Sequence, residues 1–279
     1  MPLLSSNILF QSVLILMSLT LSVATANFNG SYSSTKMHLL KDFIVKNDID
    51  IIFLQEIRHT DFSIIYNYNA YVNVGTESLG TAILTKIGIK LEDIEKLPSG
   101  RGIKGTYNKY VFMNIYAPSG SNKRSERNLF FQNDIAYFLR DLPAHCILGG
   151  DFNCVLRRED CTSDFRPSNT LQQHTNSLQL TDAWTTKHKT PGYTFFTGKS
   201  ASRLDRFYVT RALTPCLQRM EVLPTPFSDH AAVNMKIKLD VKFLTMGRSY
   251  WKMNISCLQN TDVIENFKTE WQLWQKRKK

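Results

Sequence analysis

One stretch decides how the rest of the chain is interpreted: Ile147-Leu148-Gly149-Gly150-Asp151-Phe152-Asn153. A short apolar run ends here in two glycines, and an acid and an amide follow two residues apart. Residues at i and i+2 of a strand point to the same face, so we expect Asp151 and Asn153 to project together from the end of a buried strand. Such a pair suits a water molecule, a metal ion or a phosphate. The alternative is an Asx turn that closes a core strand.

The composition limits the class of protein. The chain has 279 residues, enough for one large domain or two small ones, and its 43% hydrophobic content is too high for disorder. The net charge of +10 favours partners that are polyanions, such as nucleic acid or an anionic membrane. Five cysteines without a CxxC pair form no recognisable zinc site or disulfide framework, which favours reduced intracellular thiols.

The N-terminus supports two readings that exclude each other. Residues 8–23 are mostly apolar and Ala24-Thr25-Ala26 resembles a cleavage site, which is typical of a secretory signal peptide. However, no Lys or Arg precedes Lys36, and Gln11 interrupts the apolar run. In the other reading, residues 19–27 form the first core strand.

The hydrophobic spacing predicts an α/β sandwich of two sheets flanked by helices, in one domain over residues 19–240. The first helix begins near Ser34 or Thr35, and further helices are expected at 124–142 and 169–180. Residues 193–197 and 203–209 are expected to form a hairpin across a Gly-Lys-Ser turn. We expect strands at 19–27, 51–56, 70–74, 81–85, 109–116, 149–153, 193–197, 203–209, 222–226 and 231–239. Residues 241–279 end in Gln-Lys-Arg-Lys-Lys and are interpreted as a tail or the start of a linker.

Polar residues stand at the ends of many expected strands, where α/β folds place their ligands. Those singled out are Asn27, Glu56, Tyr116, Asp151, Asn153, Asp205, Asp229 and His230. Together they supply what a metal-assisted phosphodiesterase needs. Each of them alone is more readily explained as structural than as catalytic, and it is the shared pattern that favours a site.

The chemistry assigns each residue a task. Asn27, Glu56 and Asp229 offer the hard oxygen ligands that Mg²⁺ prefers. His230 can move a proton or stabilise charge on phosphorus, with Asp205 as the acid that orients its ring. Asp151 can orient or deprotonate the attacking water. Asn153 and Tyr116 can donate hydrogen bonds to phosphate oxygens.

Six motifs in this order resemble the endonuclease/exonuclease/phosphatase superfamily, which includes abasic-site endonucleases and DNase I-like enzymes. They are Thr25-Ala26-Asn27-Phe28-Asn29-Gly30, Leu54-Gln55-Glu56, Asn114-Ile115-Tyr116-Ala117-Pro118, Gly150-Asp151-Phe152-Asn153, Arg203-Leu204-Asp205 and Ser228-Asp229-His230. The resemblance implies a four-layered, DNase I-like sandwich of two mixed β-sheets flanked by helices.

Within the superfamily, the chain resembles the endonuclease domain of LINE-type (non-LTR) retrotransposon proteins. The segments that carry this resemblance are Asn-Phe-Asn-Gly, Asn-Ile-Tyr-Ala-Pro, Gly-Asp-Phe-Asn-Cys and Tyr193-Thr194-Phe195-Phe196, with residues 249–254 similar to the segment that leads toward a reverse transcriptase. No reverse transcriptase is present in the sequence. Asn29 stands where repair enzymes have an acid, which favours the LINE relatives over abasic-site repair.

The resemblance places Asn27 and Glu56 on the metal side of the site, and it assigns Asp151, Asn153, Asp229 and His230 to catalysis. It also implies that Thr194, Ser202 and Arg203 lie on a hairpin close to DNA. Because the first core strand would be lost by cleavage after Ala26, the resemblance favours a signal-peptide mimic, with residues 1–18 an N-terminal extension.

The expected activity is a Mg²⁺-dependent (or Mn²⁺-dependent) endonuclease that nicks DNA and leaves a 3′-hydroxyl. The expected partners are DNA and, in a full-length element, a reverse transcriptase domain, with no membrane and a nuclear location; secretion is the minority reading. The alternatives are an abasic-site or DNase I-like phosphodiesterase, a phosphatase acting on small or lipid phosphates, and a DNA-binding remnant without catalysis.

Overall fold

The computed structural model describes residues 13–30, 32–75, 80–245, 264–265, 268–269 and 271–272. One compact unit spans Met17–Val241. Most of the expected tail, and residues 1–12 of the expected extension, lie outside the described residues. In the described part of the chain, no helix is long and apolar enough to cross a membrane.

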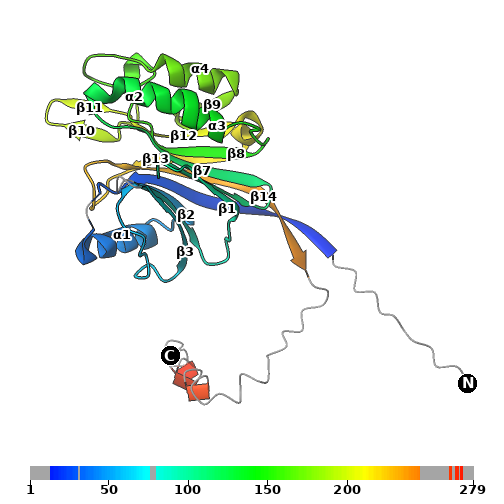
Figure 1. Ribbon diagram of the computed structural model, residues 1–279. Coiled ribbons are helices and arrows are strands. Elements are labelled where there is room, and N and C mark those ends of the chain that lie inside the picture. The colour runs from blue at the N-terminus through cyan, green and yellow to red at the C-terminus, as the bar shows by residue number, and fades with distance from the viewer. Residues whose placement is uncertain are drawn as a thin grey trace, which may run out of the picture. The chain divides into compact units, whose positions relative to one another are not determined.

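Two six-stranded sheets form the centre of the unit (Figure 1). The first sheet has the order β13 (Leu217–Leu223), β14 (Ala232–Thr245), β1 (Val13–Asn27), β2 (Ile51–Ile57), β4 (Gly80–Lys86) and β3 (Tyr68–Val74). The second has the order β5 (Glu92–Lys96), β6 (Gly102–Tyr107), β7 (Tyr110–Tyr116), β8 (Cys146–Asp151), β12 (Asp205–Thr210) and β9 (Leu180–Asp182). Each sheet contains one parallel pair, β1 with β2 and β7 with β8, among antiparallel neighbours. The prediction of two mixed sheets is confirmed.

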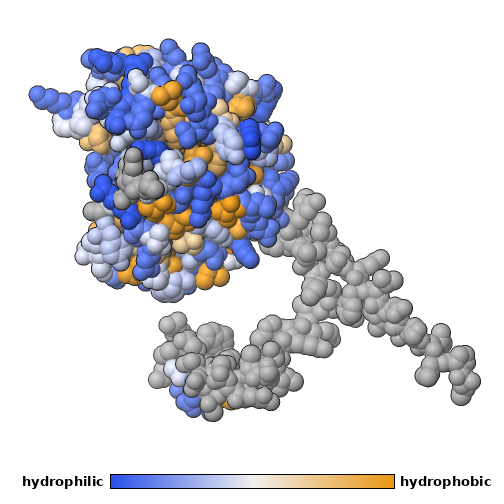
Figure 2. Space-filling view, in the orientation of Figure 1, coloured by the Kyte–Doolittle hydropathy of each residue, from blue (hydrophilic) through white to orange (hydrophobic). Residues whose placement is uncertain are grey.

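Helices cover the outer face of each sheet, so the unit has four layers (Figure 1). Helix α1 (Ser34–Lys46) packs on the first sheet, while α2 (Arg124–Leu129), α3 (Ala136–Phe138) and α4 (Asn169–Ser177) lie over the second. A central core that includes Phe53 and Phe207 separates the two sheets. The short helix α5 (Ala183–Lys187) adds Trp184 to that core. The face of the unit seen in Figure 2 is mostly hydrophilic, with apolar residues in smaller groups.

The expected first strand is confirmed and is longer than expected. Strand β1 begins at Val13, and residues 21–28 are all buried. Its neighbours are β14 on one side and β2 on the other, so it is central to the sheet. Cleavage after Ala26 would therefore remove a strand from the middle of the first sheet.

Two expected helices differ from the structure. The expected helix at 124–142 contains a π-helical segment, Phe130–Ile135, and ends at Phe138. The widened turn keeps Phe131, Ile135 and Phe138 buried on one side. The helix expected to reach residue 180 ends at Ser177, because the chain continues directly into β9.

The expected hairpin of 193–197 with 203–209 is wrong. Strand β10 (Phe195–Thr197) pairs with β11 (Ser200–Ser202), and the next strand, β12, pairs with β8 and β9 instead. Phe207 and Val209 of β12 are buried in the central core, so tertiary packing overrides the local turn signal. Strands β5 and β6 were not expected, since the charged residues of Glu92–Lys96 hide the strand pattern.

Candidate active site

Strand pairing brings the predicted residues to one edge of the sandwich. Tyr116 and Asp205 both lie beside Asp151, because β7 and β12 flank β8 in exact register at these positions. In the first sheet, Asn27 lies beside Gln55 at the ends of parallel strands β1 and β2. The predicted side chains thus come from both sheets and meet where the carboxyl ends of parallel strands lie.

A β-bulge directs Glu56 into the site. Gln55 pairs with Thr81 and Ile57 pairs with Gly80, so Glu56 has no partner on β4. Its φ of 54° places it in the left-handed region. A bulge of this kind re-aims a side chain that a regular strand would direct elsewhere. Gln55 consequently stays in the buried interior while Glu56 reaches the cleft.

The stretch from Gly149 to Asn153 is both a turn and part of the site. Asp151 Oδ1 accepts from the Asn153 backbone N–H at 2.9 Å, and Oδ2 accepts from Asn153 Nδ2 at 3.0 Å, which is an Asx turn. Gly150 has a φ of 143°, and a Cβ there would lie 2.0 Å from the Ile115 carbonyl oxygen. A Cβ on Gly149 would collide with the Phe207 ring. The two glycines therefore let the strand approach its neighbours before the acid is presented.

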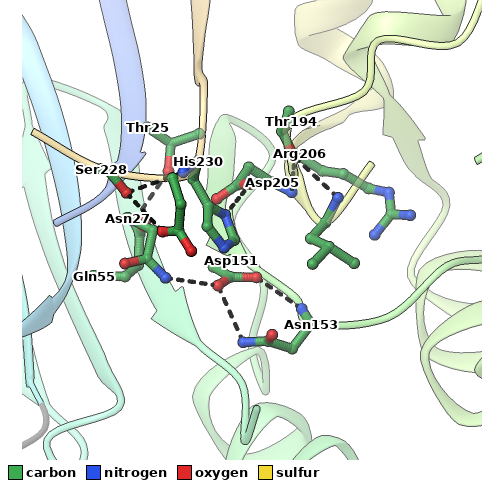
Figure 3. Close-up of polar contacts among 12 residues, drawn as sticks. Thr25, Asn27, Gln55, Asp151, Asn153, Thr194, Asp205, Arg206, Ser228 and His230 are labelled. Atoms are coloured by element: carbon green, nitrogen blue, oxygen red, sulfur yellow. Dashed lines mark hydrogen bonds and ion pairs between the residues drawn. The ribbon is translucent and has the colours of Figure 1, made fainter. Parts of the chain in front are cut away.

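Three hydrogen bonds in the site join residues of opposite sheets. Asn27 Nδ2 donates to Asp151 Oδ2 at 3.0 Å, and Tyr116 Oη donates to Glu56 Oε1 at 2.7 Å. His230, just before β14, lies with Nδ1 2.8 Å from Asp205 Oδ2 (Figure 3). The structure thus brings together seven of the eight residues that were predicted for catalysis and metal binding. The eighth, Asp229, is exposed and accepts a hydrogen bond from Asn29 Nδ2.

Burial and neighbouring charges set the protonation of the site. Burial and the negative charge of Asp205 raise the pKa of Asp151, although His230, Asn27 and the Asn153 N–H favour its ionised form. Burial alone would lower the pKa of His230, but the charge and hydrogen bond of Asp205 outweigh it and raise that pKa. Burial and the nearby Glu56 also raise the pKa of Tyr116, so its hydroxyl stays a donor. The arrangement can hold a proton on His230, which lines the cleft, beside the buried Asp205 carboxylate.

Asp151, Asp205 and Tyr116 are buried, and each hydrogen-bonds to a residue that lines a cleft of about 550 Å³. The predicted residues that line the cleft themselves are Asn27, Glu56, Asn153, Asp229 and His230. Arginines also line it: Arg127 is buried and donates to the Pro118 carbonyl at 2.7 Å, whereas Arg124 and Arg166 are exposed. The cleft therefore combines carboxylates and imidazole with cationic side chains, which suits an anionic substrate near a group that handles protons.

The donor set fits a divalent cation. Asp151, Asp205 and His230 bring one possible ligand atom each within 4.8 Å of one another, and Asp205 Oδ1 is buried without a hydrogen-bond partner. However, His230 Nδ1 and Asp205 Oδ2 already bind each other. Glu56 and Asp229, which both line the cleft, remain the carboxylates best placed for a cation. Asn27 is less open than predicted, because its Oδ1 accepts from the Asn29 N–H and its Nδ2 bridges Glu56 and Asp151.

The predicted nucleic-acid contacts need correction. Thr194 and Arg203 are 0% and 2% exposed, and protein groups occupy their polar atoms, so neither can touch DNA. Thr194 Oγ1 accepts from the backbone N–H groups of Leu204 and Asp205, and Arg203 pairs with Asp160 and Asp182. Both residues therefore have a supporting role and do not line the cleft. Ser202 is half-buried and lines the cleft, so its contact with DNA stays a prediction.

Several supporting residues were not anticipated. Asp160 is fully buried and binds both Arg203 and Arg206, which flank Asp205 in the sequence. Gln55 and Asn114 belong to motifs that were quoted, yet neither was assigned a task. No periodic or spacing signal distinguishes a buried polar partner such as Asp160 from a surface acid.

Comparison with known proteins agrees with this geometry. The model of the endonuclease/exonuclease/phosphatase family matches residues 4–230. The Xenopus laevis protein described as "Transposon TX1 uncharacterized 149 kDa protein" is 25% identical over 284 residues, which cover 92% of this chain and 21% of that protein. The chain thus spans about a fifth of the length of this relative.

Solved structures share the fold. The 3′-5′ exonuclease NExo from Neisseria meningitidis has a TM-score of 0.67 at 22% identity, covering 78% of this chain and 99% of that one. A further structure of the Neisseria protein is described as a 3′ phosphatase bound to a product DNA hairpin. An AP endonuclease from Archaeoglobus fulgidus also has a TM-score of 0.67, at 18% identity and with the same coverage of both chains. By the family model and this shared fold, the chain belongs to the endonuclease/exonuclease/phosphatase family.

Proposed function

We propose that the protein is a Mg²⁺-dependent endonuclease, for which Mn²⁺ can substitute, and that it nicks DNA and leaves a 3′-hydroxyl. The observation that carries the proposal is a cleft lined by Glu56, His230 and exposed arginines, with Asp151 and Asp205 buried and hydrogen-bonded to its lining residues. Hydrolysis of a phosphodiester requires a nucleophilic water, a cation near the phosphate and a donor for developing charge. The cleft has a candidate for each.

The roles follow from position. Asp151 Oδ2 holds two amide donors, from Asn27 and Asn153, so its carboxylate is fixed where it can orient a water toward phosphorus. His230, held by Asp205, can donate a hydrogen bond to a phosphate oxygen. Tyr116 and Asn153 can donate to the same phosphate only by giving up present acceptors, which are Glu56 Oε1 for Tyr116 and Asp151 Oδ2 or the Ala117 carbonyl for Asn153. A cation held by Glu56 and Asp229 would supply charge for the leaving 3′-oxygen.

Residue 29 favours general nicking over abasic-site repair. Asn29 Nδ2 donates to Asp229 Oδ1 at 3.1 Å, which ties this loop to the carboxylate proposed for the metal. An acid at position 29 would instead place a second negative charge there. The site therefore differs electrostatically from that of a repair enzyme.

The likeness to a transposon protein supports a role within a mobile genetic element. We infer that the chain corresponds to the endonuclease part of a LINE-type element, in which the nicked 3′ end would prime a reverse transcriptase acting on DNA in the nucleus. The partial coverage of the Xenopus protein agrees with a role within a longer protein.

A supercoiled-plasmid assay tests the proposal. We expect conversion to open circles in Mg²⁺, none in EDTA, and ends that a polymerase can extend. Asp151→Ala and His230→Ala should each lower the nicking rate at least about 100-fold, the usual effect of losing a general acid or base. Hydrolysis of a phosphoinositide without nicking would favour the phosphatase alternative. Salt-sensitive DNA binding without any turnover would favour the remnant.

A further inference from the structure

The site lies on the boundary between two sheets. Asn27, Glu56 and His230 belong to the first sheet or its connections, whereas Asp151 and Asp205 belong to the second. The bonds Asn27–Asp151, Tyr116–Glu56 and His230–Asp205 all cross from one sheet to the other. Any sliding of one sheet over the other would therefore change all three bonds together.

The apolar core between the sheets cannot set this alignment alone. Burial of apolar surface is not directional, so Phe53 and Phe207 resist separation of the sheets more than small lateral shifts. Catalytic groups need placement within about 0.5 Å. A directional contact between the sheets, close to the site, would meet this need.

Two side chains form such a contact. Gln55 Nε2 donates to Thr25 Oγ1 at 3.0 Å within the first sheet and to Asn114 Oδ1 at 2.7 Å in the second. Asn114 Nδ2 donates in return to the backbone carbonyls of Leu54 and Ala82, at 2.9 and 2.8 Å. Gln55, Asn114 and Thr25 are all 0% exposed. Each sheet thus donates at least one hydrogen bond to the other through this pair of side chains.

The position of this pair matches the site. Gln55 precedes Glu56 and lies beside Asn27 in the sheet. Asn114 lies two residues before Tyr116 on β7, and beside β8 two residues before Asp151. The contact therefore joins the strands that end in the metal-side residues to those that end in the catalytic ones.

Stability alone does not account for this glutamine. Gln55 Oε1 is buried and has no hydrogen-bond partner, which is unfavourable in an apolar interior. An apolar side chain of similar size would avoid that penalty, although it would leave Asn114 Oδ1 without its donor. The glutamine combines an unpaired Oε1 with donor groups directed to both sheets, which favours a role in alignment.

We propose that Gln55 and Asn114 are positioning residues, which lock the two sheets in the alignment that assembles the active site. This inference rests on the proposed nuclease function. It assigns a task to two motif residues that touch neither water nor phosphate.

The test uses Gln55→Met, which keeps the volume and removes both donors. We expect kcat for plasmid nicking to fall at least 10-fold while KM for DNA changes less than twofold, since the cleft surface is unaltered. The melting temperature should fall, because the buried Asn114 Oδ1 and Thr25 Oγ1 lose their donor, so the loss of kcat is judged against a control variant that is also destabilised. Gln55→Met with Asn114→Leu should lose no more activity than the worse single variant, as for residues that act as one unit.

Ser22→Ala is the matched control. Ser22 Oγ donates to Asn234 Oδ1 at 3.0 Å, a buried bond within the first sheet that joins no catalytic strands across the sandwich. We expect lower stability and unchanged kcat. Wild-type kcat in Gln55→Met, or a loss of kcat that Ser22→Ala shares, would overturn the inference.

Crystal structures separate this inference from the proposed function. In Gln55→Met, at least one of the Asn27–Asp151 and Tyr116–Glu56 contacts should lengthen beyond about 3.6 Å, where no hydrogen bond remains. If the wild-type protein fails to nick DNA, the proposed function fails, and these two distances alone decide the inference. Unchanged distances in the variant would reject it.

Discussion

At the scale of single residues, the hydroxyl of Thr194 holds the chain that carries Asp205. Its Oγ1 accepts from the backbone N–H groups of Leu204 and Asp205, both at 3.1 Å. The Thr194 carbonyl accepts from the Ala231 N–H at 2.7 Å, next to His230. One buried residue therefore supports both members of the Asp205–His230 pair, although it makes no contact with the cleft.

Thr194→Val keeps the shape of the side chain and removes the acceptor. Two N–H groups then lose their partner, so we expect the free energy of unfolding to fall by about 1–3 kcal/mol. Urea denaturation measures this change. Thr194→Ser, which restores the hydroxyl, should recover most of the loss. A valine variant as stable as the wild type would show that the hydroxyl is not needed.

At the scale of elements, buried charges join the loop after β8 to strand β12. Asp160 accepts from Arg203 Nε at 3.0 Å and from Arg206 Nη2 at 3.1 Å, while Arg206 Nη1 donates to the Cys154 carbonyl at 2.7 Å. Arg203 continues the network to Asp182 at the end of β9. Arg203 and Arg206 lie on either side of Asp205 in the sequence, so this buried network holds the start of strand β12 in place.

Asp160→Asn should be strongly destabilising, by about 3–5 kcal/mol, because it leaves the buried Arg206 guanidinium without its paired carboxylate and Arg203 with Asp182 alone. Burial would raise the pKa of Asp160, but Arg206, Arg203 and two backbone N–H groups outweigh it and lower the pKa to about 2. Because the pKa of Asp160 is lower in the folded than in the unfolded state, its carboxylate stabilises the folded state at pH values above the unfolded-state pKa. This stabilisation is lost as the pH falls toward 2. The stability gap between wild type and variant should thus narrow by about 2 kcal/mol between pH 5 and pH 2.

Denaturant titrations of both proteins across this pH range measure the gap. Asp164→Asn is the control, since this acid lies close by in the sequence but is exposed. A gap that stays constant down to pH 2 would contradict the role of the Asp160 carboxylate.

The same elements show what the sequence can and cannot predict. Apolar runs that end in polar residues, such as 51–56 and 109–116, predict both a strand and the place of a site residue, because period and position carry the signal. The 203–209 segment pairs elsewhere, since its partner is chosen by the core around Phe207 and not by the adjacent turn. Asp160 and the Gln55–Asn114 contact depend on residues far apart in the chain, which no local pattern records.

At the scale of the whole molecule, positive charge accompanies an acidic site. The chain carries a net charge of +10, and residues 246–279 contribute seven Lys and Arg and three Asp and Glu, a net charge of +4. Arg124 and Arg166 add exposed charge at the cleft itself. The acids proposed to hold the cation thus belong to a protein whose net charge favours polyanions, and we expect binding and chemistry to depend on different residues.

This separation predicts how DNA affinity depends on salt. Each phosphate neutralised by Lys or Arg should contribute about −0.9 to the slope of log K against log salt concentration. We expect a steep slope for the full chain, a shallower one for residues 1–245, and a slope reduced by about 1 for each of Arg124→Gln and Arg166→Gln. Fluorescence anisotropy with a labelled duplex in EDTA measures binding without cleavage. None of the residues proposed for the site belongs to 246–279, so nicking by 1–245 at low salt should persist; a slope near zero would mean that the protein does not hold DNA through its phosphates.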